Sequence, residues 1–262
     1  MPFWGDGDNT GVVVNESLSN QYESGTPPMK KTILFSATAL FAGSLLAADA
    51  NPKDEIAAAA KKLGEQTSYS WKSTVVVPEG SRFRPGPTEG KTEKNGFTHV
   101  TMSFGDNTTE AVLKGNKGAI TNRDGGWQSL ADLENSEGAG RFIGRMLQGF
   151  KTPATQAAEL AAGAKELKKE GDAYSGDLTE ESAKALLTFR GRTDGAPTVS
   201  NANGSVKFWM KDGALSKFET KVTGKVSFDG SDRDVDRTTT VEIKDVGTTK
   251  VEVPEDAKNK FL

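Results

Sequence analysis

The pattern of apolar and polar positions changes its period early in the chain and predicts first a helix and then a strand. Asn51 is a good N-cap, Pro52 suits the first helical position, and apolar residues follow at helical spacing, which predicts a helix over Pro52–Leu63. From residue 69 to 77, apolar and polar residues alternate with a period of two, as in a half-buried strand. The switch between the two periods predicts a helix that leads directly into a sheet.

Shorter alternating segments further along the chain predict two antiparallel meanders with helices between them. Asp212-Gly213 is the strongest hairpin signal, because Asp-Gly suits the tight turns that join antiparallel strands. Ser129–Phe150 is helical in type, and Thr152 and Thr179 are suitable N-caps for two further helices. The other predicted strands are 100–104, 109–114, 118–122, 165–170, 173–178, 206–210, 214–222, 226–228, 238–246 and 248–253, whereas 78–87 and 191–204 are predicted as loops. These elements predict an α+β fold that is mainly β, with an antiparallel sheet.

Residues Met29–Ala50 have the features of a secretory signal peptide. A positively charged start at Lys30 and Lys31 precedes an apolar run that is too short to span a bilayer comfortably, and small residues follow this run. We therefore predict a cleaved signal peptide at 29–48 and a single exported, β-rich domain at 49–262, located in the periplasm or outside the cell. An uncleaved N-terminal anchor and a chain that is never exported are the alternatives.

Residues 1–28 precede this segment and show little hydrophobic periodicity. They are rich in Gly, Asp, Asn and Ser, and such a segment buries too little apolar surface to offset the entropy lost on ordering. We expect a disordered N-terminal extension that is not native, with Met29 as the start of the protein.

The composition limits the class of protein further. The chain has 262 residues, a formal net charge of −3 and no cysteine. Such a chain is long enough for one domain with a substantial core, and it must hold its fold without disulfides. The absence of cysteine excludes a lipid-modified N-terminal cysteine, and the near-neutral charge gives no electrostatic reason to expect nucleic acid as a partner.

Candidate catalytic and metal-ligating residues are few. His99 is the only histidine, so neither a Ser-His-Asp triad nor a histidine-rich metal site can form. Asp232, Asp234 and Asp236 imitate the start of a calcium loop, but Arg237 stands where that loop needs glycine. No spacing selects the paired carboxylates of a glycosidase, and no glycine-rich phosphate loop is present. We therefore predict no enzymatic activity, no metal and no cofactor.

Apolar residues spread over the two meanders and the helix before residue 150 are the candidates for a binding site. A sheet that curls around such residues can enclose a pocket, and four glycines weaken the helix that would cover it. The alternative is that these side chains simply fill a solid core. The predicted lining residues are Trp71, Met102, Phe104, Trp127, Phe142, Met146, Phe150, Phe208 and Met210.

The order of elements and several local motifs resemble a known group of bacterial envelope proteins. The motifs are Tyr69–Trp71 after the first helix, Asp124–Trp127, Val206–Leu215 and the closing Val246–Pro254. In these features the chain resembles the lipoprotein localisation factor superfamily, which comprises LolA-like carriers and LppX-type lipoproteins. The resemblance implies a half-open antiparallel β-barrel whose concave face is covered by helices and which holds acyl chains without catalysis.

Three hypotheses for function follow. The first is a periplasmic carrier or binding protein that holds a lipid, a lipoprotein acyl chain or another apolar ligand, with a transient membrane or envelope protein as partner. The second is a structural or interaction protein of the cell envelope, with a solid core and no ligand. The third is a hydrolase that uses two of the many carboxylates, which would need a cleft with paired and perturbed acidic groups.

Overall fold

The computed structural model describes residues 51–81, 84–105, 107–122, 124–136, 139–188, 197–228 and 230–261. All of these residues belong to one compact unit, Ala47–Leu262. The signal peptide predicted at 29–48 and the extension predicted at 1–28 lie outside the described residues, so both stay predictions. Within the described part of the chain, no helix has the length and the apolar character needed to cross a membrane.

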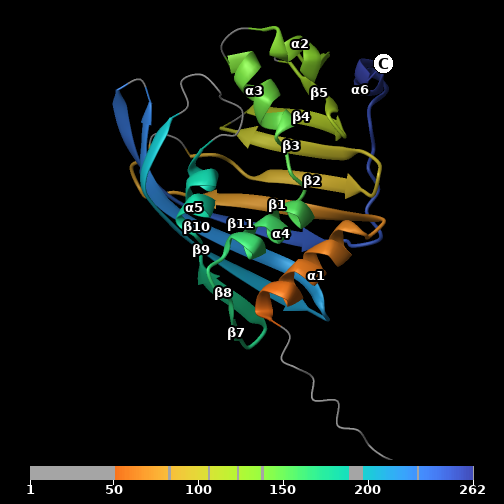
Figure 1. Cartoon of the computed structure of the whole chain (residues 1–262). Helices are drawn as coiled ribbons and strands as arrows, with labels where there is room; N and C mark the ends of the chain where they lie inside the picture. Colours follow the sequence, from red (N-terminus) through yellow and green to blue (C-terminus); the bar gives the residue numbers. More distant parts are fainter. Residues whose placement is uncertain are drawn as a thin grey trace, which may run out of the picture. The chain divides into compact units, whose positions relative to one another are not determined.

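An open antiparallel sheet of eleven strands forms the framework of the fold (Figure 1). Each strand pairs with its neighbours in antiparallel fashion, and the two edge strands are not joined to each other. From one edge to the other the strands are β6 (Trp127–Ser129), β5 (Lys117–Thr121), β4 (Asn107–Lys114), β3 (Thr98–Phe104), β2 (Thr88–Glu93), β1 (Ser68–Val76), β11 (Ser231–Lys244), β10 (Ala214–Phe228), β9 (Thr198–Lys211), β8 (Ala173–Asp177) and β7 (Lys168–Glu170). The predicted mainly β fold with a curved, half-open sheet is confirmed.

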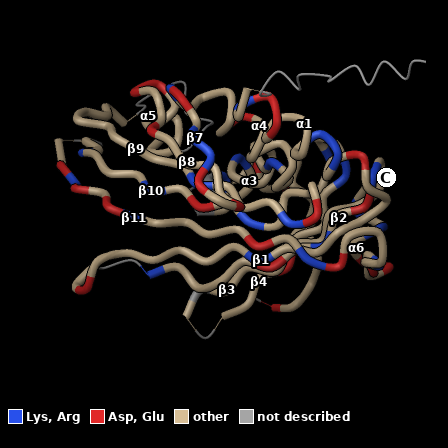
Figure 2. The backbone as a smooth tube through the Cα atoms, turned by 90° about the horizontal axis from the view of Figure 1, so that it is seen from below, with Lys and Arg blue, Asp and Glu red and all other residues tan. Residues whose placement is uncertain are grey.

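Four of the helices lie on one face of this sheet. Seen along its edge, α1, α3, α4 and α5 lie on the same side of the strands, and the end of the sheet formed by β7 to β9 curls toward them (Figure 2). This face is therefore the concave one. The helices are α1 (Pro52–Gly64), α2 (Leu130–Glu134), α3 (Ala139–Gln148), α4 (Pro153–Gly163) and α5 (Glu180–Leu187), and the chain ends with α6 (Glu255–Lys258) and the 3-10 turn η1 (Asn259–Phe261).

Local capping explains where α1, α4 and α5 begin. The Asn51 side chain accepts a hydrogen bond from the backbone N–H of Lys53 at 3.0 Å. Thr152 and Thr179 cap α4 and α5 in the same manner. Each side chain satisfies one of the backbone donors that the first helical turn leaves without a partner. All three predicted helix starts are confirmed.

The single helical segment predicted over Ser129–Phe150 is wrong, because the structure divides it into α2 and α3. Ser129 and Asp132 form a reciprocal capping box at the start of α2, and α2 ends after one turn at Asn135. Gly144 of α3 packs so closely on α2 that a Cβ atom there would lie 3.0 Å from the Cβ of Leu133. The glycines therefore allow two short helices to pack against each other.

Two other predictions for secondary structure are corrected. Residues 198–204, predicted as loop, form the first half of β9, whose polar side chains suit its largely exposed position. The strand predicted at 248–253 does not form, although the backbone N–H of Val251 donates to Glu93 Oε1 at 3.1 Å. Polar strand β2 was also missed, since only Gly90 and Thr92 of its six residues are buried. In β2 and in the first half of β9, pairing with neighbouring strands outweighs local propensity.

The buried side chains form a main cluster and a smaller one on the concave face. The main cluster lies beneath α1 and α4 and includes Trp71, Phe208 and Phe218. The smaller cluster lies beneath α5 and includes Leu187 and Val222. A third cluster, around Val112 and Ala257, lies on the opposite face, where α6 packs. The two concave-face clusters frame the candidate site.

Candidate ligand-binding groove

An open groove of about 910 Å³ lies on the concave face of the sheet, between α4, α5, the end of α3 and strands β10 and β11. It is lined by Met146, Gly149, Phe150, Lys151, Gln156, Glu159, Leu160, Ala162, Gly163, Thr179, Glu181, Ser182, Ala185, Leu186, Thr188, Phe218, Thr220, Val222, Arg237 and Thr239. The wall thus combines helices from the middle of the chain with strands from its C-terminal part.

One side of the groove is the margin of the main apolar cluster. Met146 and Phe150 are half-buried and pack against that cluster, to which Leu160 and Phe218 belong. The Phe150 ring stacks on the Trp71 ring, with 5.9 Å between ring centroids and an interplanar angle of 25°. Because Trp71 is itself fixed in the core, this stack holds the linker between α3 and α4 in place against the sheet.

The other side of the groove is the smaller cluster beneath α5. Leu186 packs against both clusters, and Val222 of β10, which belongs to the smaller cluster, also lines the groove. At one end of the groove α4 meets α5 at Gly163, where a Cβ atom would lie 2.2 Å from Ser182 Oγ. A side chain at that position has no room, so the two helices close this end of the groove.

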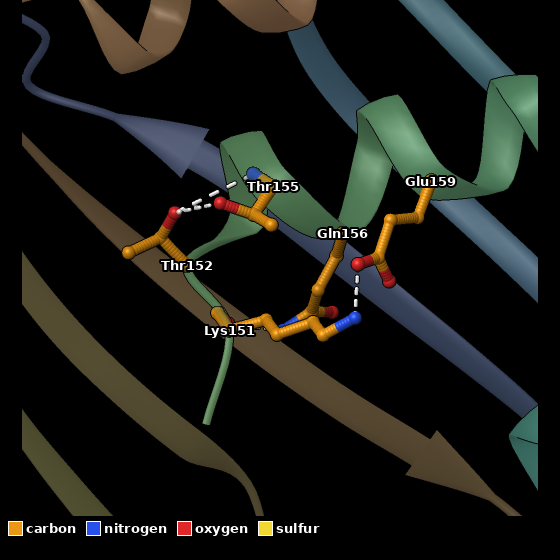
Figure 3. Close-up of polar contacts among 5 residues, drawn as sticks. All are labelled: Lys151, Thr152, Thr155, Gln156 and Glu159. Atoms are coloured by element: carbon orange, nitrogen blue, oxygen red, sulfur yellow. Dashed lines mark hydrogen bonds and ion pairs between the residues drawn. The ribbon is translucent and has the colours of Figure 1, made fainter. Parts of the chain in front are cut away.

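Polar groups lie along the α4 side of the groove (Figure 3). Lys151 Nζ forms an ion pair with Glu159, and Gln156 Nε2 donates to the backbone carbonyl oxygen of Lys151 at 2.7 Å. Thr152 and Thr155 form the capped first turn of α4 beside them. These contacts give the groove a polar margin next to its apolar wall.

Arg237 of β11 is a half-buried charged residue that lines the groove. Its guanidinium donates to the backbone carbonyl oxygen of Leu186, near the C-terminus of α5. Burial lowers the pKa of the Arg237 guanidinium from its ordinary value. Arg237 forms no ion pair with a carboxylate in the described part of the chain. The group therefore retains hydrogen-bond donors that no anionic side chain satisfies.

The predicted lining residues fall into different surroundings. Met146 and Phe150 line the groove. Trp71, Met102 and Phe208 lie in the closed core, with exposed fractions of 5%, 6% and 0%, and Met210 packs half-buried against it. A role of these residues in binding stays a prediction, and only the first two border open space.

Of the other three predicted lining residues, one lies on the outer face and two have side chains outside the described residues. Trp127 lies on the outer face, in the cluster that contains Phe97 and Phe261. Phe104 ends β3 and Phe142 belongs to α3, but their side chains lie outside the described residues. Trp127 is thus separated from the groove by the sheet itself.

Sequence reasoning missed Leu186, Val222 and Arg237 as groove residues. A signal for Arg237 is present in the alternation of β11. Val241 and Ile243 belong to the main cluster, so odd-numbered positions of this strand face the concave side and even-numbered positions face the outer side. The aspartates at 232, 234 and 236 therefore point away from the side that carries Arg237. The residues described contain no group of acidic or histidine side chains that could hold a metal ion.

The remaining polar candidates lie outside the groove. His99 is on the outer face, where its Nε2 is 2.9 Å from Glu110 Oε2. A second cavity, of about 550 Å³, lies at the β5 edge of the sheet and is lined by polar residues such as Lys117 and Glu134 together with Phe261. None of the predicted lining residues borders it.

Comparison with known proteins gives similarity of structure only. No family model and no curated protein matches the chain. LprF from Mycobacterium bovis is 11% identical, with a TM-score of 0.43, over 78% of this chain and 96% of that one. The lipoprotein LppX from Mycobacterium tuberculosis is 12% identical, with a TM-score of 0.40, over 77% and 96%.

A DUF1329 family protein from Desulfovibrio piger is 9% identical, with a TM-score of 0.31, over 74% of this chain and 90% of that one. The LppX-type lipoproteins that the sequence resembles are thus represented among the similar structures.

Proposed function

We propose that the protein is a non-enzymatic carrier or binding protein that holds an acyl chain or another apolar ligand in the groove between the sheet and the helices. The observation that carries this proposal is the groove itself. Its volume of about 910 Å³ lies in the range of about 300–1,000 Å³ that is typical of small-molecule sites. Met146, Phe150, Leu160, Leu186 and Phe218 supply an apolar wall.

Binding would be driven by removal of apolar surface from water. Each buried methylene contributes about 0.8 kcal/mol, which corresponds to about a fourfold gain in affinity. A series of saturated chains should therefore bind about fourfold more tightly per added methylene until the groove is filled. A series whose affinity does not depend on chain length would contradict an acyl-chain site.

The proposal includes export. The segment at 29–48 would direct the chain to the periplasm or beyond, where a membrane or an envelope protein would deliver and accept the ligand transiently. N-terminal sequencing of the exported protein tests this part, and a mature N-terminus near residue 49 is the expected result. A retained segment would favour an anchored form.

The direct test is native mass spectrometry of protein purified from the exported fraction without detergent, followed by solvent extraction. We expect a co-purifying mass that extracts as a lipid. In the Met146→Asp variant this mass should be lost, because the charge would lie on the apolar wall of the groove. Val246→Asp is the matched control, since Val246 is 42% exposed and does not line the groove.

A protein that shows no bound mass and takes up no lipid on later addition would support the second candidate, an interaction protein with a solid core. The closed packing of Trp71, Met102 and Phe208 favours that candidate for the main cluster. Hydrogen exchange distinguishes the carrier from the interaction protein. Amides of α3 that are as protected as those of the central strands would indicate a fixed cover.

A further inference from the structure

The charged groups around the groove are not in equivalent surroundings. Lys151 and Glu159 are paired with each other, and Glu159 and Glu181 are exposed to solvent. Arg237 is instead half-buried and carries no carboxylate partner in the described residues. The charges of Lys151, Glu159 and Glu181 are therefore either paired or hydrated. Arg237, by contrast, is a partly dehydrated cation in the wall of an apolar groove.

Partial withdrawal of a charge from water is unfavourable unless a counter-ion compensates for it, so an anion beside the half-buried Arg237 guanidinium would be stabilising. The carbonyl oxygen of Leu186 accepts one of its N–H groups. Since a guanidinium has five N–H donors, the remaining ones are available for an anion. A planar guanidinium matches a carboxylate or a phosphate in a two-point contact.

The position of Arg237 relative to the apolar wall fits one end of an amphiphile. Arg237 pairs with Val222 across β10 and β11, whereas Phe218 pairs with Val241. The two pairs are four residues apart on β11, or about 13 Å at the rise of a strand. Phe150 lies further in the same direction, stacked on Trp71, whose partner on β11 is Ile243. A chain that runs from Arg237 toward Phe150 thus follows the apolar side of the groove.

We propose that Arg237 binds the single anionic headgroup of the ligand, a carboxylate or a phosphate, while the alkyl chain lies along the groove toward Phe150. This inference rests on the proposed function and narrows it from an apolar ligand to an anionic amphiphile. If Arg237 had only a structural role and held the end of α5 through Leu186, its replacement would change the affinity for neutral and anionic ligands equally.

The test is displacement of a neutral fluorescent naphthylamine probe from delipidated full-length protein. The competitors share one chain length and are used below their micelle concentrations: dodecanol, methyl dodecanoate, dodecanoate and dodecyl phosphate. In the wild-type protein we expect the two anions to bind about tenfold to a hundredfold more tightly than the two neutral compounds, as a charged hydrogen-bonded pair predicts.

The variants are Arg237→Gln, Arg237→Lys and, as the matched control, Arg233→Gln. Arg233 lies on the same strand, is exposed and does not line the groove. We expect Arg237→Gln to lose the preference for anions, so that the affinity of dodecanoate relative to dodecanol falls to about one, whatever the absolute affinities. Arg237→Lys should keep part of the preference, and Arg233→Gln should keep all of it.

The outcomes separate this inference from the proposed function. If none of the four compounds displaces the probe, the proposed function fails. If dodecanol and methyl dodecanoate bind but the anions bind no more tightly, or if Arg237→Gln keeps the preference, only the headgroup assignment is overturned. If Arg237→Gln does not fold, the wild-type comparison of dodecanoate with its methyl ester and the Arg237→Lys protein decide. A preference for dodecyl phosphate over dodecanoate would indicate a phospholipid, and the reverse a fatty acid.

Discussion

The concave face of the sheet carries two regions that differ in how their helices cover them. Beneath α1 and α4 the side chains are sealed, and Phe208 has no exposed surface. Beneath α5 only a small cluster forms, and the groove opens between the two. Both regions rest on the same strands, β9 to β11. The helix above an apolar residue, rather than its residue type, therefore decides whether that residue fills a core or borders a cavity.

Small residues explain why the first region is sealed. Ala59 and Ala60 of α1 and Ala157 and Ala161 of α4 are buried, and the two helices pack side by side. Such residues let helix backbones approach closely and leave no gap above the sheet. Helix α5 contributes only Ala183 and Leu187 to full burial, so it rests on the sheet with less apolar contact.

The largest expected effect comes from Phe208→Ala in the sealed region. The loss of a fully buried aromatic side chain should reduce the free energy of unfolding by about 3–5 kcal/mol. Met146→Ala, at the margin of the groove, should cost less than half as much, because Met146 is already half-exposed. Urea denaturation measures both. Equal losses would show that the groove is closed in solution.

A smaller effect is expected from Gly90→Ala, which disturbs the Trp71–Phe150 stack where the sealed region meets the groove. A Cβ atom at position 90 would lie 2.2 Å from the Trp71 ring, so the ring must move. Overpacking of this kind costs about 1–3 kcal/mol. The displaced ring would also lose its stack on Phe150, and tryptophan fluorescence should shift. Gly80→Ala is a poor control because of its positive φ, whereas Gly126→Ala, with no atom nearer than 3.4 Å, is a suitable one.

Removal of the N-caps tests the difference between α4, which covers the sealed region, and α5, which covers the open one. Thr152→Ala and Thr179→Ala each remove a cap hydrogen bond and should reduce the free energy of unfolding by about 1 kcal/mol. Hydrogen exchange should show the difference between the regions, with amides of α5 losing protection locally in Thr179→Ala and amides of α4 changing little in Thr152→Ala. Similar local opening of both helices would contradict the comparison.

The smallest effect concerns Tyr69 in the sealed region and appears only at alkaline pH. Burial raises the pKa of the Tyr69 hydroxyl above its ordinary value. The folded protein therefore holds this proton more tightly than the unfolded chain, so the stabilisation is complete below pH 10 and is lost as the pH rises through the folded-state pKa. Tyr69→Phe should weaken this alkaline loss in unfolding experiments. An unchanged pH profile in the variant would show that other groups cause it.

Local signals predicted those parts of the fold that local chemistry decides. The starts of α1, α4 and α5 follow from caps at Asn51, Thr152 and Thr179, and the β9–β10 turn follows from Asp212-Gly213. Strand β2 was missed, because its few buried positions are a glycine and a threonine that lie beneath Trp71. Its place in the sheet depends on its neighbours rather than on its own sequence.

The candidate site was predictable only in part, for the same reason. Met146 and Phe150 were expected at a cavity and line the groove, but Trp71 and Phe208, of the same chemical kind, lie in the sealed core. Nothing in the linear sequence tells which strand each helix will cover. Arg237 was detectable from the alternation of β11 once the direction of that strand was known.

The two strands at the middle of the sheet come from opposite ends of the domain. Trp71 of β1 pairs with Ile243 of β11, and the sheet is complete only when this pairing has formed. Contacts between residues so distant in sequence slow folding, because a long loop must close before they form. A chain synthesised from its N-terminus therefore has no central pair of strands until its last strand has emerged, and the groove beside β11 is among the last features to take shape.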